Sequence, residues 1–299
     1  MWNSSALAVL CAGVALAALA DDTPAAETTA PLSIRWAKEH LTVSGPHVPG
    51  GSIDVHYLEA FCRAGSSDRD WSQTVIRHKT ELLSAGDDGR KIQLRSTLAD
   101  GVVVTHELSA AADEVDFRLV AKNPTKVASQ AVWAQPCVRV DRFTGRTQDD
   151  YLDKCFVFLD GRLTRLPTQP WAAKARYTPG QVWRPKNVGK DDVNPRPLSE
   201  LTPSNGLIGC FSADNKMLLA SAWEPYQELF QGVITCVHSD FRIGGLAPGE
   251  SKHIRGKLYL VPADVDSLLK RYDRDFPEQV GSRCRTGVKR PYFLFYCEQ

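Results

Sequence analysis

Apolar and polar residues alternate with a period of two along most of this chain, and this pattern limits the fold more than any other feature. Between residues 115 and 122, every second side chain is apolar: Val115, Phe117, Leu119 and Ala121. The same alternation runs through 102–108 and 252–261. It is typical of half-buried antiparallel strands. Further strands are expected near 53–60, 73–83, 91–97, 130–141, 155–160, 206–212, 216–223 and 229–238.

This number of strands predicts an all-β protein, a large antiparallel β-sandwich that forms a single domain over residues 32–299. One helix is expected at 263–276. Asp264 stands at its start and Pro277 ends it. Its apolar stripe has helical spacing: Val265, Leu268, Leu269, Tyr272 and Phe276.

The first 20 residues contain no charged side chain and read as a signal peptide. The apolar run 6–20 is too short for a membrane helix, and Ala18-Leu19-Ala20 forms a cleavage site before Asp21. Residues 21–31 read as a flexible linker. Signal peptides usually carry a basic residue near Met1, and this chain has none there. The alternative is that the segment is not cleaved and stays as a membrane anchor. No other stretch approaches the length of a membrane span. After cleavage of the signal peptide, we expect a periplasmic or extracellular protein.

The charge balance and the cysteines narrow the possible partners. Lys and Arg total 36 against 35 Asp and Glu, which argues against a nucleic-acid partner. Seven cysteines follow the signal, and we expect Cys284 to pair with Cys297. Cys137, Cys210 and Cys236 lie in apolar runs and read as buried thiols. Because no CxxC, HxH or HExxH motif is present, we predict neither a metal centre nor a cofactor.

Residues 161–206 differ from the rest of the chain and predict a long basic loop. They contain seven prolines, with eight basic against three acidic residues. Long loops inside compact domains are often functional. One hypothesis is that the loop covers an end of the sandwich and binds an anionic glycan through Arg176, Trp183 and Arg184. The alternative is a proline-stiffened surface loop whose arginines pair with acidic residues elsewhere.

The segment 102–141 reads VVVTHELSAAADEVDFRLVAKNPTKVASQAVWAQPCVRVD. A strand with His106-Glu107-Leu108 leads to a strand ending in Asn123-Pro124, and a third strand carries Trp133 and Gln135. This order, with the turn at 246–251, resembles the galactose mutarotase-like superfamily of carbohydrate-binding β-supersandwiches and their relatives among secreted bacterial proteins. The resemblance implies a sugar-related function, while such a fold alone does not fix a reaction.

One face of the strand expected at 130–141 is suited to binding a sugar. Trp133, Gln135, Arg139 and Asp141 share this face with Cys137. Tryptophan stacks on the apolar face of a sugar ring, and the polar side chains bind its hydroxyls. The alternative is a solvated outer face with an Arg139–Asp141 ion pair.

The run Trp223-Glu224-Pro225-Tyr226 gives a second candidate, with an acid between aromatic side chains. Here Glu224 is the candidate general base and His238 the candidate acid. Alternatively, Trp223 and Tyr226 belong to the core and Glu224 to a turn. His106 shares the apolar face of its strand and reads as a core histidine.

Two functions follow from these residues. The first is a secreted carbohydrate-binding protein for an acidic or neutral glycan. The second is a carbohydrate-active enzyme, an epimerase, lyase or hydrolase, that uses His238 and Glu224 as an acid–base pair.

We expect the exported protein to begin at Asp21, because the Ala18-Leu19-Ala20 site precedes it. Mass measurement of the protein secreted by the expressing cells checks this. An intact N-terminus at Met1 contradicts it.

Overall fold

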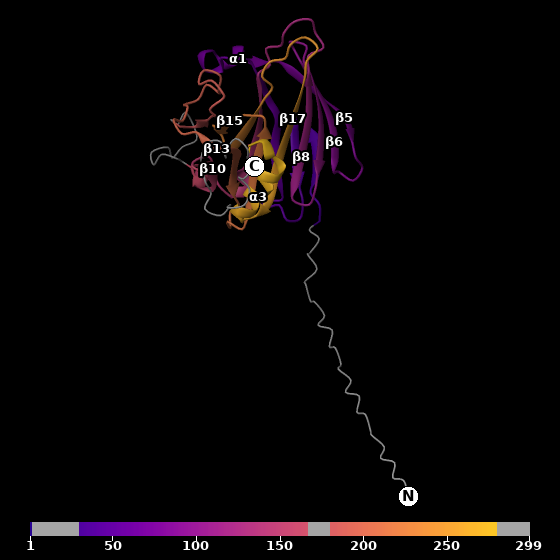
Figure 1. Cartoon of the computed structure of the whole chain (residues 1–299), viewed down its shortest axis with the longest axis vertical. Coiled ribbons are helices and arrows are strands. Elements are labelled where there is room, and N and C mark those ends of the chain that lie inside the picture. Colours follow the sequence, from indigo (N-terminus) through magenta and orange to yellow (C-terminus); the bar gives the residue numbers. More distant parts are fainter. Residues whose placement is uncertain (2–29, 167–179, 280–299) are drawn as a thin grey trace.

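Two antiparallel sheets packed face to face form the body of the protein (Figure 1). The computed structural model describes Met1 and residues 30–166 and 180–279. The leader, nearly all of the linker, Arg176 and the expected Cys284–Cys297 pair lie outside the described residues. The expected all-β sandwich with a C-terminal helix is confirmed.

The first sheet consists of strands from both halves of the chain. In spatial order they are β1 (Ser33–Ala37), β2 (His40–Ser44), β3 (Ser52–Cys62), β9 (Trp133–Arg139), β16 (Cys236–Arg242), β15 (Tyr226–Gln231) and β12 (Val182–Trp183), with β4 (Val75–Ile76) paired to β3. Because β9 lies between β3 and β16, the centre of this sheet is made of three segments far apart in sequence.

The second sheet is longer and more regular. Its order is β11 (Arg162–Arg165), β10 (Cys155–Leu159), β13 (Pro203–Phe211), β14 (Met217–Glu224), β17 (Ser251–Pro262), β8 (Glu114–Lys122), β7 (Val103–Ala110), β6 (Lys91–Leu98) and β5 (His78–Ala85). The four alternating residues identified in 115–122 are all buried in the core between the sheets, as their spacing predicts.

Helical segments are few in the described part of the chain. They are η1 (Ser66–Asp68), α1 (Trp71–Thr74), α2 (Asp141–Thr144), η2 (Tyr151–Lys154) and α3 (Val265–Asp275). None of these described helices has the length and apolar character needed to cross a membrane.

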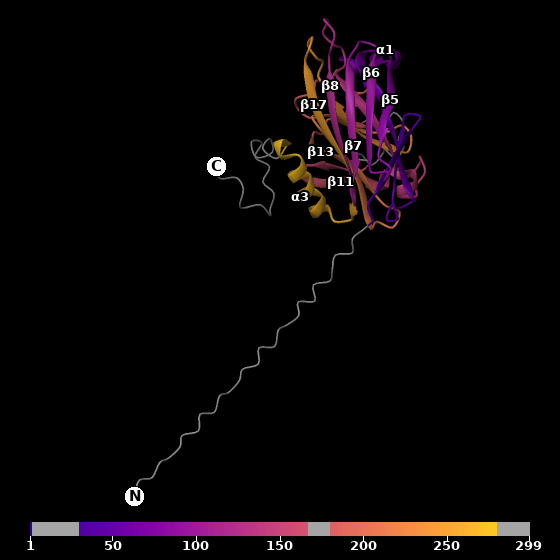
Figure 2. The same ribbon diagram turned by 90° about the vertical axis from the view of Figure 1, so that its right-hand side faces the viewer.

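Helix α3 begins and ends one or two residues inside the range expected from the sequence. The Asp264 side chain caps it by accepting a hydrogen bond from the Ser267 backbone N–H at 3.0 Å. Leu268, Leu269 and Tyr272 pack on the outer face of the second sheet, against residues of β10, β13, β14 and β17. Figure 2 shows α3 alongside the sandwich and α1 at the upper end of the sandwich.

The long basic loop expected at 161–206 is not one loop. It contains β11 and β12 and enters β13. Residues 180–200 pack on the first sheet, because apolar residues within them have partners there: Val182, Val188 and Val193 cluster with Phe230 of β15.

His106 is a core histidine, as its position on the apolar face predicts. The Tyr57 hydroxyl lies 3.0 Å from its Nδ1, and the Ser96 hydroxyl lies 3.0 Å from its Nε2. A neutral ring satisfies both contacts, donating to one hydroxyl and accepting from the other. Burial, aided by the nearby charge of His78, lowers the pKa of His106 to about 3.

We predict that His106 makes the fold sensitive to acid. Its folded pKa lies below the unfolded value of 6.5, so the unfolded chain binds the proton first as the pH falls. Relative to His106→Gln, the wild type loses up to about 1.4 kcal/mol of unfolding free energy per pH unit between pH 6.5 and 3. Urea unfolding of both proteins across this range measures the difference. Parallel pH profiles contradict the prediction, and the profiles above pH 7 serve as the control.

Candidate functional site

The outer face of the first sheet carries polar side chains that are nevertheless buried. Val138, Leu229 and Val237 of β9, β15 and β16 point into the core between the sheets. The alternating positions therefore point away from it. These outward side chains are Gln135, Cys137, Arg139, Glu228, Phe230, Cys236, His238, Asp240 and Arg242, and only Arg139 and Arg242 retain partial exposure.

Residues 180–200, here called the covering segment, bury this face. The backbone N–H of Asn194 donates to both carboxylate oxygens of Glu228, at 3.1 and 3.0 Å. The Asn194 side chain donates to Gln135 Oε1 at 3.2 Å. Arg242 donates to Asp192 at 3.0 Å. The segment is thus attached by polar bonds to β15, β9 and β16.

Two carboxyl groups lie side by side beneath the covering segment. Glu228 and Asp240 are opposite each other in the β15–β16 register, and neither has measurable exposure. Burial and then the neighbouring acidic groups raise the pKa of Asp240 well above its usual range. Burial likewise raises the pKa of Glu228. Two adjacent buried carboxyl groups do not both ionise readily. The pair therefore retains a proton at pH values well above the usual pKa of a carboxyl group.

A cavity of about 90 Å³ opens between this face, the covering segment and α1. Trp71 of α1 lines it and is 38% exposed. Gln135 donates from Nε2 to Glu59 at 3.4 Å and accepts from Asn194, so Glu59, Gln135 and Asn194 form one hydrogen-bonded row along the cavity. The complete lining is Glu59, Trp71, Gln135, Cys137, Asn194, Arg196, Phe230, Val233, Ile234, Cys236 and His238.

The structure brings only part of the predicted strand site together. Gln135 lines the cavity, as does His238 of the second candidate site. Trp133 is fully buried, and its indole N–H donates to Ser66 Oγ at 2.9 Å, so its predicted role as a sugar-stacking surface is wrong. Arg139 ends β9 outside the cavity lining, and Asp141 belongs to α2 instead of the strand.

The expected pairing of His238 with Glu224 is also wrong. Glu224 ends β14 in the second sheet and lines a different groove of about 650 Å³. Burial raises the pKa of Glu224, and the Gln279 amide donates to its carboxylate. That groove is lined by Thr105, Glu107, Arg118, Leu119, Val120, Glu224, Pro225, His253, Ile254, Arg255 and Glu278.

The remaining aromatic candidates are structural. Trp223 is buried between the sheets beside Phe117 and Phe241, and Tyr226 packs against the same core. Trp183 is completely buried, so its predicted role in the glycan site is wrong. Arg184 donates to the Val188 carbonyl at 2.6 Å, which closes a turn within the covering segment.

Several residues of the site were not predicted from the sequence: Glu59, Trp71, Asn194, Glu228 and Asp240. The alternation Cys236-His238-Asp240 was a usable signal, because residues two apart on a strand share a face. Trp71 and Asn194 lie outside the long strands, and no local pattern marks them.

No model of a protein family and no curated protein matches the chain. Among solved structures, it is similar to a galactose mutarotase-like protein from Lactobacillus casei, with 7% identity over 77% of this chain and 99% of that one, at a TM-score of 0.41. A galactose mutarotase-like protein from Clostridium acetobutylicum shares 10% identity over 77% and 94% of the two chains, at a TM-score of 0.40. A proposed aldose 1-epimerase from Escherichia coli K12 shares 12% identity over 77% of this chain and 98% of that one, at a TM-score of 0.39.

We predict that Arg242 keeps the covering segment on the sheet. Arg242→Met removes its bonds to Asp192 and Gln227 and leaves the half-buried Asp192 carboxylate without this cation. Loss of such a charged partner costs about 1–3 kcal/mol. Hydrogen exchange of residues 188–196 should therefore accelerate, while β6 stays protected. The control is Arg95→Met, which breaks an exposed pair with Glu81. Unchanged protection of 188–196, or equal effects of both variants, rejects the prediction.

Proposed function

We propose that this protein binds a carbohydrate at the cavity between the first sheet and its covering segment. The observation that supports this best is the half-exposed Trp71 beside the hydrogen-bonded row of Glu59, Gln135 and Asn194. An indole face packs well against the apolar C–H surface of a sugar ring. A few fixed polar groups next to it supply orientation and specificity.

The polar groups suit hydroxyls better than a single charge. The Glu59 carboxylate accepts hydrogen bonds, and the side-chain amides of Gln135 and Asn194 both donate and accept. A hydroxyl group also does both, so neighbouring hydroxyls of one sugar can satisfy this row in turn. Arg196 lines the same cavity and adds a cationic group.

The size of the cavity defines how the sugar would lie. About 90 Å³ corresponds to roughly three water molecules in liquid volume, well under the 300–1,000 Å³ of sites that enclose a whole ligand. The cavity therefore takes one end of a sugar, while the rest of the ring lies against Trp71. Because the sequence predicts a signal peptide, we propose that this binding takes place in the periplasm or outside the cell.

The enzyme alternative has weaker support. An acid–base reaction at a sugar needs both groups within reach of one substrate. Glu224 and His238 line separate cavities on different sheets. Polarimetry of a freshly dissolved aldose with the protein should consequently show no acceleration of mutarotation, and an acceleration would favour the enzyme.

Trp71→Ala should weaken sugar binding at least tenfold, because it removes the stacking surface, and tenfold corresponds to about 1.4 kcal/mol. Asn194→Ala should weaken it through loss of an amide partner. Calorimetry and ligand-observed NMR with a panel of neutral sugars and uronic acids measure the affinities. Uronic acids that bind better, and lose this advantage in high salt, would assign the anionic class.

Leu83→Ala is the matched control, because Leu83 is an exposed apolar side chain on β5 of the other sheet. It should leave affinity unchanged. Equal affinities in the Trp71 variant, the control and the wild type would place the sugar elsewhere. Absence of binding to every sugar in the panel rejects the proposed function.

A further inference from the structure

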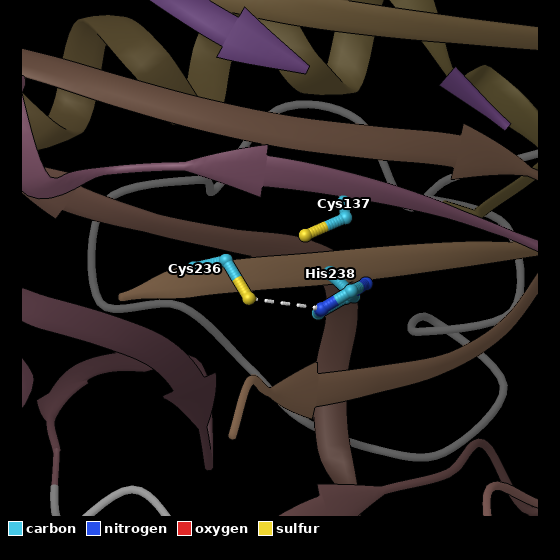
Figure 3. A group of neighbouring side chains, drawn as sticks. All are labelled: Cys137, Cys236 and His238. Carbon is cyan, nitrogen blue, oxygen red and sulfur yellow. Dashed lines mark hydrogen bonds between the residues drawn. The ribbon is translucent and has the colours of Figure 1, made fainter. Parts of the chain in front are cut away.

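We infer that Cys137, Cys236 and His238 bind a Zn²⁺ ion at the floor of the cavity. Figure 3 shows the three side chains converging on one space, Cys137 from β9 and the other two from β16. All three are buried, and they lie on the outward face of neighbouring strands. The sequence predicted buried thiols and no metal centre, because no single segment contains all three ligands.

The distances suit tetrahedral zinc. The potential ligand atoms all lie within 4.8 Å of one another, and Cys236 Sγ lies 3.3 Å from His238 Nε2. Zinc binds sulfur at about 2.3 Å and imidazole nitrogen at about 2.0 Å, so its ligand atoms stand roughly 3.5–3.8 Å apart in a tetrahedron. Small side-chain rotations bring the three atoms to that spacing.

The strand pairing explains how the three ligands meet. Val138 lies opposite Val237, so Cys137 and His238 are next in the antiparallel register and Cys236 is two residues from His238 on the same face. Gly232 contributes space, because a Cβ at that position would collide with Cys236 Sγ.

The second nitrogen of His238 supplies an independent observation. His238 Nδ1 lies 4.0 Å from Asp240 Oδ1. His238 Nδ1 has no hydrogen-bond partner of normal geometry among the described residues, and the Asp240 carboxyl group interacts with the adjacent Glu228; both His238 and Asp240 are buried. Histidine ligands of zinc commonly direct their other N–H to a carboxylate, which fixes the ring and strengthens the ligand. With zinc on Nε2, the Nδ1–H faces Asp240, and this buried ring nitrogen acquires a role.

Three protein ligands leave the fourth zinc position open toward the cavity. Zinc sites with two cysteines, one histidine and a water molecule are an established type, and they differ from closed structural sites in this open position. Zinc is favoured over Cu⁺ because the imidazole–carboxylate arrangement and four-coordination are typical of zinc. The inference stands independently of sugar binding, which concerns Trp71 and the hydrogen-bonded row.

Metal analysis of the full chain tests the inference. The protein, purified reduced and without chelator, should take up one equivalent of Zn²⁺. Replacement by Co²⁺ should give the thiolate charge-transfer and visible bands of a tetrahedral site. Cys137→Ala, Cys236→Ala and His238→Ala should each lose the bound ion and the bands. Asp240→Asn should keep the stoichiometry and lose about 10–100-fold in affinity.

Cys210→Ala is the matched control, since Cys210 is a buried free thiol in the core between the sheets. It should retain the metal. Circular dichroism distinguishes a lost ligand from a lost fold in each variant. Absence of zinc from the folded wild type, retention of zinc by the three ligand variants, binding of Cu⁺ alone, or a Cys137–Cys236 disulfide in the purified protein would each overturn the inference. Sugar titrations of the zinc-free protein show separately whether the proposed binding site is correct.

Discussion

The bonds from the covering segment to the outer face of the first sheet are the interactions on which the candidate site depends. That face carries carboxyl and imidazole groups, whose charged forms are stable in water, together with two thiols. Asn194 donates hydrogen bonds to Glu228 and Gln135, and Arg242 donates one to Asp192. These bonds hold the covering segment over the face and exclude water from it. The small cavity lies between this cover, the sheet face and α1.

The two sheets are covered in physically different ways. The second sheet receives α3 through an apolar stripe, and the stabilisation there is hydrophobic burial of about 1.5–3 kcal/mol for each large side chain. The first sheet receives an irregular segment held by charge-assisted hydrogen bonds and a small apolar cluster. A buried polar group without a partner costs free energy, so each one needs an explanation such as a catalytic role, strain, or a bound water or ion.

Acidic side chains gather near the cavity. Glu59 lines it, and Glu228 and Asp240 lie on the same outward sheet face as the two thiols and the imidazole. A divalent cation held by the thiols would bring positive charge to this acidic region without an additional basic side chain.

The sequence by itself determined the long strands, the C-terminal helix α3 and the burial of His106. These depend on local periodicity, with alternation for β7 and β8, 3.6-residue spacing for α3, and Asp264 as its cap. It also proposed Gln135 and His238 as site residues, and both line the cavity. Only the tertiary structure decided their neighbours. The strand order places β9 beside β16, so Cys137 lies next to His238, whereas Glu224 ends a strand of the other sheet. Alternation tells which side chains share a face, but it contains no information about which face another segment will cover. Trp133 and Trp183, both candidates for sugar stacking from the sequence, are buried, whereas Trp71 of α1 is 38% exposed.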